Sequence, residues 1–411
     1  MFLPVTWPTH RSSYPRPVIV NLLPMPQSDG PAAPREASPY AHHIPSLDGI
    51  RGLAILLVLF GHLFPSSSYS PNPFVQAVLS LRAVTWVGVN LFFALSGFLI
   101  TGILVDTLHN PHYFRSFFGR RALRIFPLYY GVLIVLLVLT PFFPMHWNGS
   151  QYLFLTYTQN LPFIINPKGP APWAVLSHFW SLAVEEQFYL VWPVILYWLR
   201  APRRIMLATI VGAAIALGLR TALALAHGFP QNHATPFCMD ALLAGAALAL
   251  LVRSRYHDAA LRFGLPLFAA AAVLIGVPAL RSANFDWESS FYLTTIGLTI
   301  VNLGAAGLIA ASLRPRSLIR SLFSGPVLRF FGKYSYGLYV FHYSADAILA
   351  GRLHSFFQSH GMGKGSVVVA TGIMTTAASV LIALISYHAY EQPFLRLKRR
   401  FAYDRPLAAK A

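Results

Sequence analysis

The sequence has little charge and almost no cysteine. Only 11% of its 411 residues are charged, and Cys238 is the single cysteine. One cysteine excludes an intrachain disulfide and any cysteine-based metal cluster. The low charge, together with 55% hydrophobic residues, excludes an ordinary soluble domain. No continuous apolar core precedes a small-residue cleavage site near the N-terminus, so we expect no cleavable signal peptide.

Apolar runs of about twenty residues recur along the chain, and this pattern is typical of a multi-span membrane protein. We predict an all-α, polytopic helical bundle with about ten transmembrane helices. The sixth run is short and rich in alanine, glycine and leucine, so we expect it to pack inside the bundle. The predicted spans are residues 48–65, 84–105, 122–143, 179–199, 204–227, 236–252, 260–280, 289–312, 327–350 and 366–389.

Acidic residues are scarce as well, with 13 Asp and Glu against 31 Lys and Arg. If the N-terminus lies in the cytoplasm, the predicted cytoplasmic segments hold 24 of the 31 basic residues and the outside segments hold five. This asymmetry follows the positive-inside rule. The net charge of +18 therefore marks topology and does not indicate nucleic-acid binding. An even number of spans places both termini in the cytoplasm.

Composition divides the chain into three parts. Residues 1–45 hold ten of the 31 prolines and show no periodicity, so we predict a disordered tail. Residues 46–394 hold all ten predicted spans. Residues 395–411 are predicted to form a basic cytoplasmic tail.

The first span carries three ionisable groups, Asp48, Arg51 and His62, which are costly inside a bilayer. Arg51 and His62 are eleven residues apart, so they share one face of a helix and are separated by about 16 Å of rise. Either Arg51 reaches lipid phosphates while His62 bonds a neighbouring carbonyl, or this face lines a functional channel.

Other predicted spans also carry polar groups. The third opens with "FFGRRALRIFPLYY", whose arginines either mark topology or bind phosphate through bidentate guanidinium contacts. The fourth contains "HFWSLAVEEQFYLVWP", where Glu185 and Glu186 point about 100° apart and need different partners. His178 stands seven residues before Glu185, on nearly the same face. The remaining polar candidates in the spans are Ser96, Tyr189, Tyr336 and His342.

A bundle with this polar interior suits either transfer chemistry across a membrane or proton-coupled transport. The sequence motifs favour transfer chemistry. In order, "SLDGIRGLAILLVLFGH", "FFALSGFLI", "FFGRRALRIFPLYY", "HFWSLAVEEQFYLVWP", "SYGLYVFHY" and "YEQPF" resemble the membrane-bound acyltransferase-3 family of bacteria. The resemblance implies that residues 46–394 form a transmembrane acyltransferase domain in the bacterial inner membrane, and we expect a stand-alone form without an esterase-like domain.

The resemblance implies an enzyme that moves an acyl group, most often acetyl, from cytoplasmic acyl-CoA to a hydroxyl of a sugar-containing acceptor. It implies no permanently bound cofactor and no metal; the partners are membrane lipids, acyl-CoA and a glycan, and not nucleic acid. A proton-coupled exporter of a sugar or organic anion is the alternative. The sixth-span motif "PFCMDALLAG" lacks the arginine expected nearby, which leaves the role of Asp240 open.

The motif matches also imply roles for individual residues. His62 acts on the acceptor hydroxyl as a general base or first takes the acyl group itself, and Glu185 assists it by orienting His62 or holding the acceptor. The donor-binding residues are Arg51, Arg120, Arg121 and Arg124. The expected substrate-binding residues are Asp48, Ser96, His178, Tyr189, Tyr336 and His342.

Overall fold

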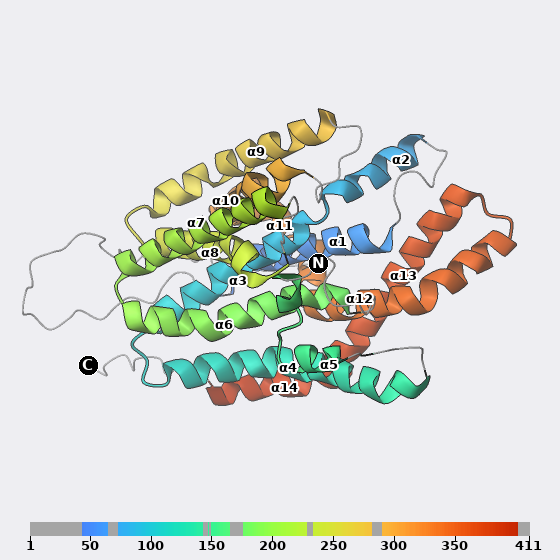
Figure 1. The fold of residues 1–411 in the computed structure, drawn as a ribbon, viewed down its shortest axis with the longest axis horizontal. Coiled ribbons are helices and arrows are strands. Elements are labelled where there is room, and N and C mark those ends of the chain that lie inside the picture. The colour runs from blue at the N-terminus through green and yellow to red at the C-terminus, as the bar shows by residue number, and fades with distance from the viewer. Residues whose placement is uncertain are drawn as a thin grey trace, which may run out of the picture.

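The computed structural model describes residues 43–64, 73–142, 147, 149–164, 176–227, 233–281 and 290–401. Within these ranges every regular element is a helix, and the helices form a bundle (Figure 1). The all-α prediction is therefore confirmed. The predicted N-terminal tail lies outside the described residues except for its last three positions, and so do residues 402–411 of the predicted C-terminal tail.

A described helix lies over each of the ten predicted spans. In chain order these helices are α1 (Pro45–Leu63), α3 (Val87–Asp106), α4 (Tyr113–Leu139), α6 (Trp180–Leu199), α7 (Pro202–His227), α8 (Thr235–Leu251), α9 (His257–Arg281), α10 (Leu298–Leu313), α12 (Pro326–Ser359) and α13 (Lys364–Ser386). The shorter helices are α2 (Pro73–Ser80), α5 (Ser150–Leu155), α11 (Leu318–Phe323) and α14 (Gln392–Leu397), and a 3₁₀ turn covers Lys398–Phe401.

Seven of the described helices are long and apolar enough to cross a membrane, namely α1, α3, α4, α7, α9, α10 with the π-helical turn before it, and α13 with the helical residues that follow it. The other three are α6, α8 and α12. The helix α8 is apolar but has only 17 residues, as the sequence predicts. The helices α6 and α12 carry the carboxylates, histidines and tyrosines of the motifs, and these side chains lower their mean hydropathy.

The helix α1 lies inside the bundle, packed between α12 and α3. A side chain at Gly52 would overlap the backbone of Leu328, and one at Gly332 would overlap the backbone of Asp48. The close approach that Gly52 permits is thus to a helix and not to a ligand. Since the start of α1 meets the start of α12 and His62 meets His342 further along, the two helices run parallel.

Asp240 forms an ion pair with Arg220 that is fully buried. The guanidinium of Arg220 on α7 donates to both carboxylate oxygens of Asp240 on α8, at 2.7 and 2.9 Å. The pair is completed by Thr299, whose hydroxyl donates to Asp240 at 2.8 Å, and by the Phe237 carbonyl. The arginine expected near the sixth span therefore comes from the fifth, and Asp240 holds three helices together.

Candidate active site

The outer part of the site is a pair of histidines. Nδ1 of His62 on α1 lies 3.0 Å from Nε2 of His342 on α12, and the two rings are stacked. Nδ1 of His342 lies 2.8 Å from the Tyr339 carbonyl, which can only accept a hydrogen bond. In neutral His342 the proton is therefore on Nδ1, and Nε2 accepts from His62 Nδ1–H. This arrangement leaves the lone pair of His62 on Nε2, and His62 is exposed whereas His342 is fully buried.

A third histidine packs against this pair. His178 lies in the 3₁₀ turn Ser177–Phe179 just before α6, with its ring 4.7 Å from the His342 ring and stacked on Tyr343. It is 3% exposed, and its ring lies against the backbone of Tyr339 and Val340 on α12. The structure therefore brings His62, His178 and His342 together, although they are far apart in the sequence.

Glu185 lies in the middle of the bundle and not beside the histidine pair. It accepts a hydrogen bond from Ser96 on α3, and the hydroxyl of Tyr189 donates to the Ser96 oxygen at 3.1 Å. Three predicted site residues, Ser96, Glu185 and Tyr189, thus form one chain of polar contacts. The residue that orients His62 is His342, so the orienting role expected for Glu185 does not match the geometry. Glu186 points to a different part of the bundle, toward Tyr157, because neighbouring positions on a helix point about 100° apart.

The four predicted donor-binding arginines gather on the side of Glu185 away from the histidines. Arg51 on α1 lies close enough to Arg121 and Arg124 on α4 for their positive charges to repel one another. All three lie close enough to Glu185 to attract its carboxylate. The guanidinium of Arg121 lies 5.2 Å from the ring centroid of Tyr189. Among the described residues, neither Arg121 nor Arg124 forms a hydrogen bond or ion pair. Positive charge without paired carboxylates is typical of an anion site.

Asp48 belongs to the edge of this cluster. Its carboxylate accepts from Arg51 at 3.1 Å and lies 2.5 Å from Nε2 of His43. The carboxylate therefore holds Arg51 in place. A substrate role for Asp48 remains a prediction from the sequence, but its observed contacts are with these two side chains.

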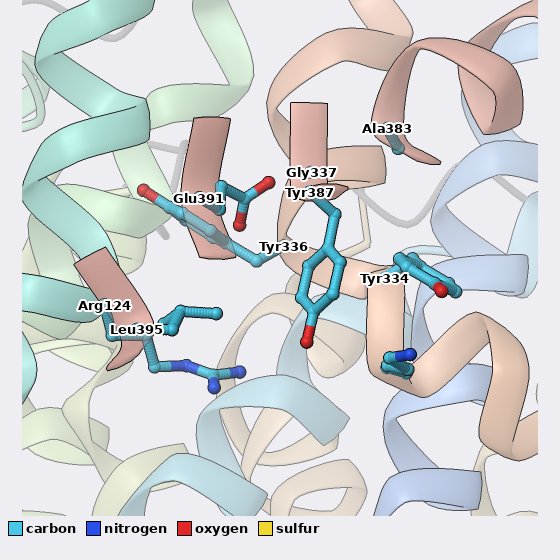
Figure 2. A pocket seen from close by; sticks show the side chains of 9 residues that line it. Arg124, Tyr334, Tyr336, Gly337, Ala383, Tyr387, Glu391 and Leu395 are labelled. Carbon is cyan, nitrogen blue, oxygen red and sulfur yellow. The ribbon is translucent and has the colours of Figure 1, made fainter. Parts of the chain in front are cut away.

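A small, partly open pocket lies beside Arg124, between α4, α12, α13 and α14 (Figure 2). Figure 2 shows that the Arg124 guanidinium and the Tyr387 ring point into the same space. Tyr336 also lines it and donates its hydroxyl to the Ile125 carbonyl at 2.8 Å. The sequence motifs identified Arg124 and Tyr336. They did not identify Lys333, Tyr387 or Glu391 as lining residues, although "YEQPF" drew attention to the last of these.

The polar groups are ordered along the helices. On α1, Arg51 and His62 are eleven residues apart, and on α12 the sequence of groups is Lys333, Tyr336 and His342. Because α1 and α12 are parallel neighbours, both place a cation near the start of the helix and a histidine two to three turns further along, at the end of α1 and in the middle of α12. The arrangement is therefore a polar track about 16 Å long, with positive charge at one end, a carboxylate in the middle and an imidazole base at the other.

Comparison with known proteins fits this geometry. The model of a family described as an acyltransferase domain matches residues 44–385. The chain is 27% identical over 372 residues to the peptidoglycan O-acetyltransferase of Listeria monocytogenes, covering 85% of this chain and 56% of that protein. It is 29% identical over 380 residues to a putative peptidoglycan O-acetyltransferase of Bacillus subtilis, covering 86% and 55%.

A putative O-acetyltransferase of Staphylococcus aureus is 26% identical over 375 residues, covering 86% of this chain and 57% of its own length. The chain thus spans about half the length of these curated relatives. No solved structure matches the chain.

Proposed function

The chain belongs to the family of membrane acyltransferases whose model covers residues 44–385, and from this we propose that it transfers an acetyl group from acyl-CoA to a hydroxyl of a glycan. The names of the relatives support an O-acetyltransferase activity. The observation that carries the proposal is the track itself: an anion site and an accessible imidazole base are joined by buried polar side chains.

The donor is proposed to enter at the arginine end. Acyl-CoA carries several phosphate groups, and arginine forks bind phosphate bidentately. Arg121 and Arg124 have guanidinium groups without a paired carboxylate, and the pocket beside Arg124 offers an entrance. With this end in the cytoplasm, as the distribution of basic residues predicts, the pantetheine arm would extend past Glu185 toward His62.

The chemistry is proposed to take place at Nε2 of His62. This atom takes the proton of the acceptor hydroxyl, whose oxygen attacks the thioester carbonyl, and the departing CoA thiolate recovers the proton. Alternatively, Nε2 attacks the thioester carbonyl and expels the CoA thiolate, and the acceptor oxygen then takes the acyl group from the imidazole while its proton passes to the thiolate. Both routes use the same lone pair, because the bond from His62 Nδ1–H to His342 directs the other nitrogen outward. His178, whose ring packs against His342 and Tyr343, is proposed to bind the acceptor.

Replacing Arg124 by alanine should mainly weaken donor binding. Loss of a hydrogen bond to a charged group costs about 1.5–3 kcal/mol, which corresponds to about ten- to a hundredfold in the Michaelis constant for acyl-CoA. Lysine should restore only part of the affinity, because an ammonium cannot bind phosphate bidentately. The measurement is initial rate against acetyl-CoA concentration, with Arg203→Ala on the exposed start of α7 as control. A fall in turnover with donor affinity unchanged would contradict the phosphate assignment.

The activity itself is tested with the purified chain in liposomes. Acetyl-CoA outside and a glycan preparation inside should together yield free CoA and a glycan heavier by one acetyl group in mass spectrometry. A cell comparison with and without the protein should show the same mass difference on surface glycans. Movement of a sugar or organic anion without CoA release would instead identify an exporter.

A further inference from the structure

The chain beyond α13 turns back onto α4. The helix α14 and the 3₁₀ turn Lys398–Phe401 both contact α4, and Figure 1 shows α14 lying along it. The ring of Phe401 packs directly on Gly119, where a Cβ atom would overlap the ring. The Arg115 guanidinium lies 5.9 Å from the centroid of the same ring. These contacts hold the end of the described chain against α4, at the residues that directly precede Arg120 and Arg121 in the sequence.

Because this C-terminal segment packs on α4, Lys398 lies beside the arginine cluster. Lys398 lies within electrostatic range of all four arginines, Arg51, Arg120, Arg121 and Arg124. It is partly buried, whereas the adjacent Arg399 and Arg400 are exposed. Within the described chain, Lys398 forms no hydrogen bond and no ion pair.

Five cations close together repel one another, and partial burial removes the water that would screen them. The carboxylates nearby offset only part of this charge. Asp48 pairs with Arg51, and Glu391 lies beside Arg124, but neither of them pairs with Lys398. Native structures keep such clusters where a bound anion compensates the charge. The packing of Phe401 on Gly119 supplies the apolar contact that holds Lys398 there against the repulsion.

We propose that Lys398 is a fifth cationic ligand of the phosphorylated acyl donor, and that the contact between Phe401 and Gly119 seats it in the site. The inference rests on the proposed function and deepens it. The residue lies beyond residues 44–385, which the family model matches. The C-terminal segment is thus a component of the donor site and not a free basic tail.

The test measures binding of acetyl-CoA to the full chain in nanodiscs, by microscale thermophoresis. Lys398→Ala should weaken binding about tenfold or more, the usual scale for a lost hydrogen bond to a charged group. Arg399→Ala removes the same charge one residue away on an exposed position and should bind like the wild type. Pantetheine, which has no phosphate, should bind equally weakly to all three proteins.

A second variant tests the contact between Phe401 and Gly119 separately from the charge of Lys398. Gly119→Ala keeps every cation but displaces the Phe401 ring, so it should weaken acetyl-CoA binding in the same direction as Lys398→Ala. Thermal unfolding of each variant without ligand shows whether the bundle remains intact. A Gly119→Ala protein that unfolds like the wild type and binds acetyl-CoA equally well would refute the role of this contact.

The same cluster could hold the phosphate of a lipid headgroup, and the nanodisc composition separates the two sources. In phosphatidylcholine nanodiscs the loss on Lys398→Ala should persist; a loss seen only with phosphatidylglycerol would assign Lys398 to lipid. If the wild type binds acetyl-CoA and Lys398→Ala binds it equally, this inference is wrong while the proposed function stands. If the wild type does not bind acetyl-CoA, both are wrong.

Discussion

Replacing His62 by alanine should lower acyl transfer by about two orders of magnitude or more, the usual scale for the loss of a general base. Glutamine keeps the size of the side chain and can still donate to His342, but it has no basic nitrogen. His62→Gln should therefore fail as badly as His62→Ala. Because His62 is exposed, neither change leaves a large cavity, and both proteins should remain folded in detergent.

The measurement is release of CoA from acetyl-CoA in the presence of a glycan acceptor, at saturating donor. His354→Gln, at an exposed position on α12, is the matched control and should be fully active. Binding of acetyl-CoA should be nearly unchanged in His62→Gln, because the proposed phosphate site lies at the other end of the track. A glutamine variant with near-normal turnover would show that His62 only packs or bonds its neighbour.

His342 provides a second test of the same geometry. His342→Phe fills the space but removes the acceptor for His62 Nδ1–H, so the His62 proton is free to move to Nε2 and block the reactive lone pair. Turnover should fall while affinity for acetyl-CoA stays the same. His342→Gln offers an amide oxygen in place of the ring nitrogen and should recover part of the rate. Equal activity of both variants would contradict the positioning role.

Breaking the buried pair of Arg220 and Asp240 should be the most damaging change to stability. Removing one partner leaves an uncompensated charge in the low-dielectric interior, at a cost of about 3–5 kcal/mol. Both side chains are essentially fully buried, at 0% and 1% exposure, and the pair links α7, α8 and Thr299 on α10. Arg220→Met and Asp240→Leu should each lower the unfolding temperature sharply in detergent.

The double variant Arg220→Met with Asp240→Leu should be more stable than either single variant, because no unpaired charge remains in the interior. The pair Arg253 and Asp106 is the comparison, since Asp106 is 25% exposed and its loss should cost less. Asp240→Asn also tests function. A well-folded Asp240→Asn protein with donor binding intact and transfer abolished would mean that Asp240 takes part in the reaction and is not a structural residue.

Several features of the site were readable from local patterns. The Arg51–His62 spacing predicted one helix face, and α1 presents both residues to the polar track. The adjacent pair Glu185 and Glu186 predicted two different surroundings, which the structure contains. Helical periodicity is a local property, so a single helix suffices to predict which of its residues share a face.

Contacts between helices could not be predicted in this way. His342 as the partner of His62, Arg220 as the partner of Asp240 and Lys398 beside the arginines join residues separated by 280, 20 and more than 270 positions. Nothing in one helix specifies which neighbour it meets. That choice depends on where small residues such as Gly52, Gly332 and Gly119 allow backbones and rings to approach.

The sequence by itself determined that this protein is a helical membrane bundle, which of its faces are polar, and which motifs it shares with the acyltransferase family. Hydropathy, charge asymmetry and helical spacing are encoded residue by residue, so no tertiary contact is needed to recognise them. Only the tertiary structure decided which polar groups pair with one another. The pairing turns Asp240 into a structural residue and His342 into the partner that directs His62 outward. The physical reason is that a buried polar group must find its hydrogen-bond partner across helices, and only packing brings that partner within 3 Å.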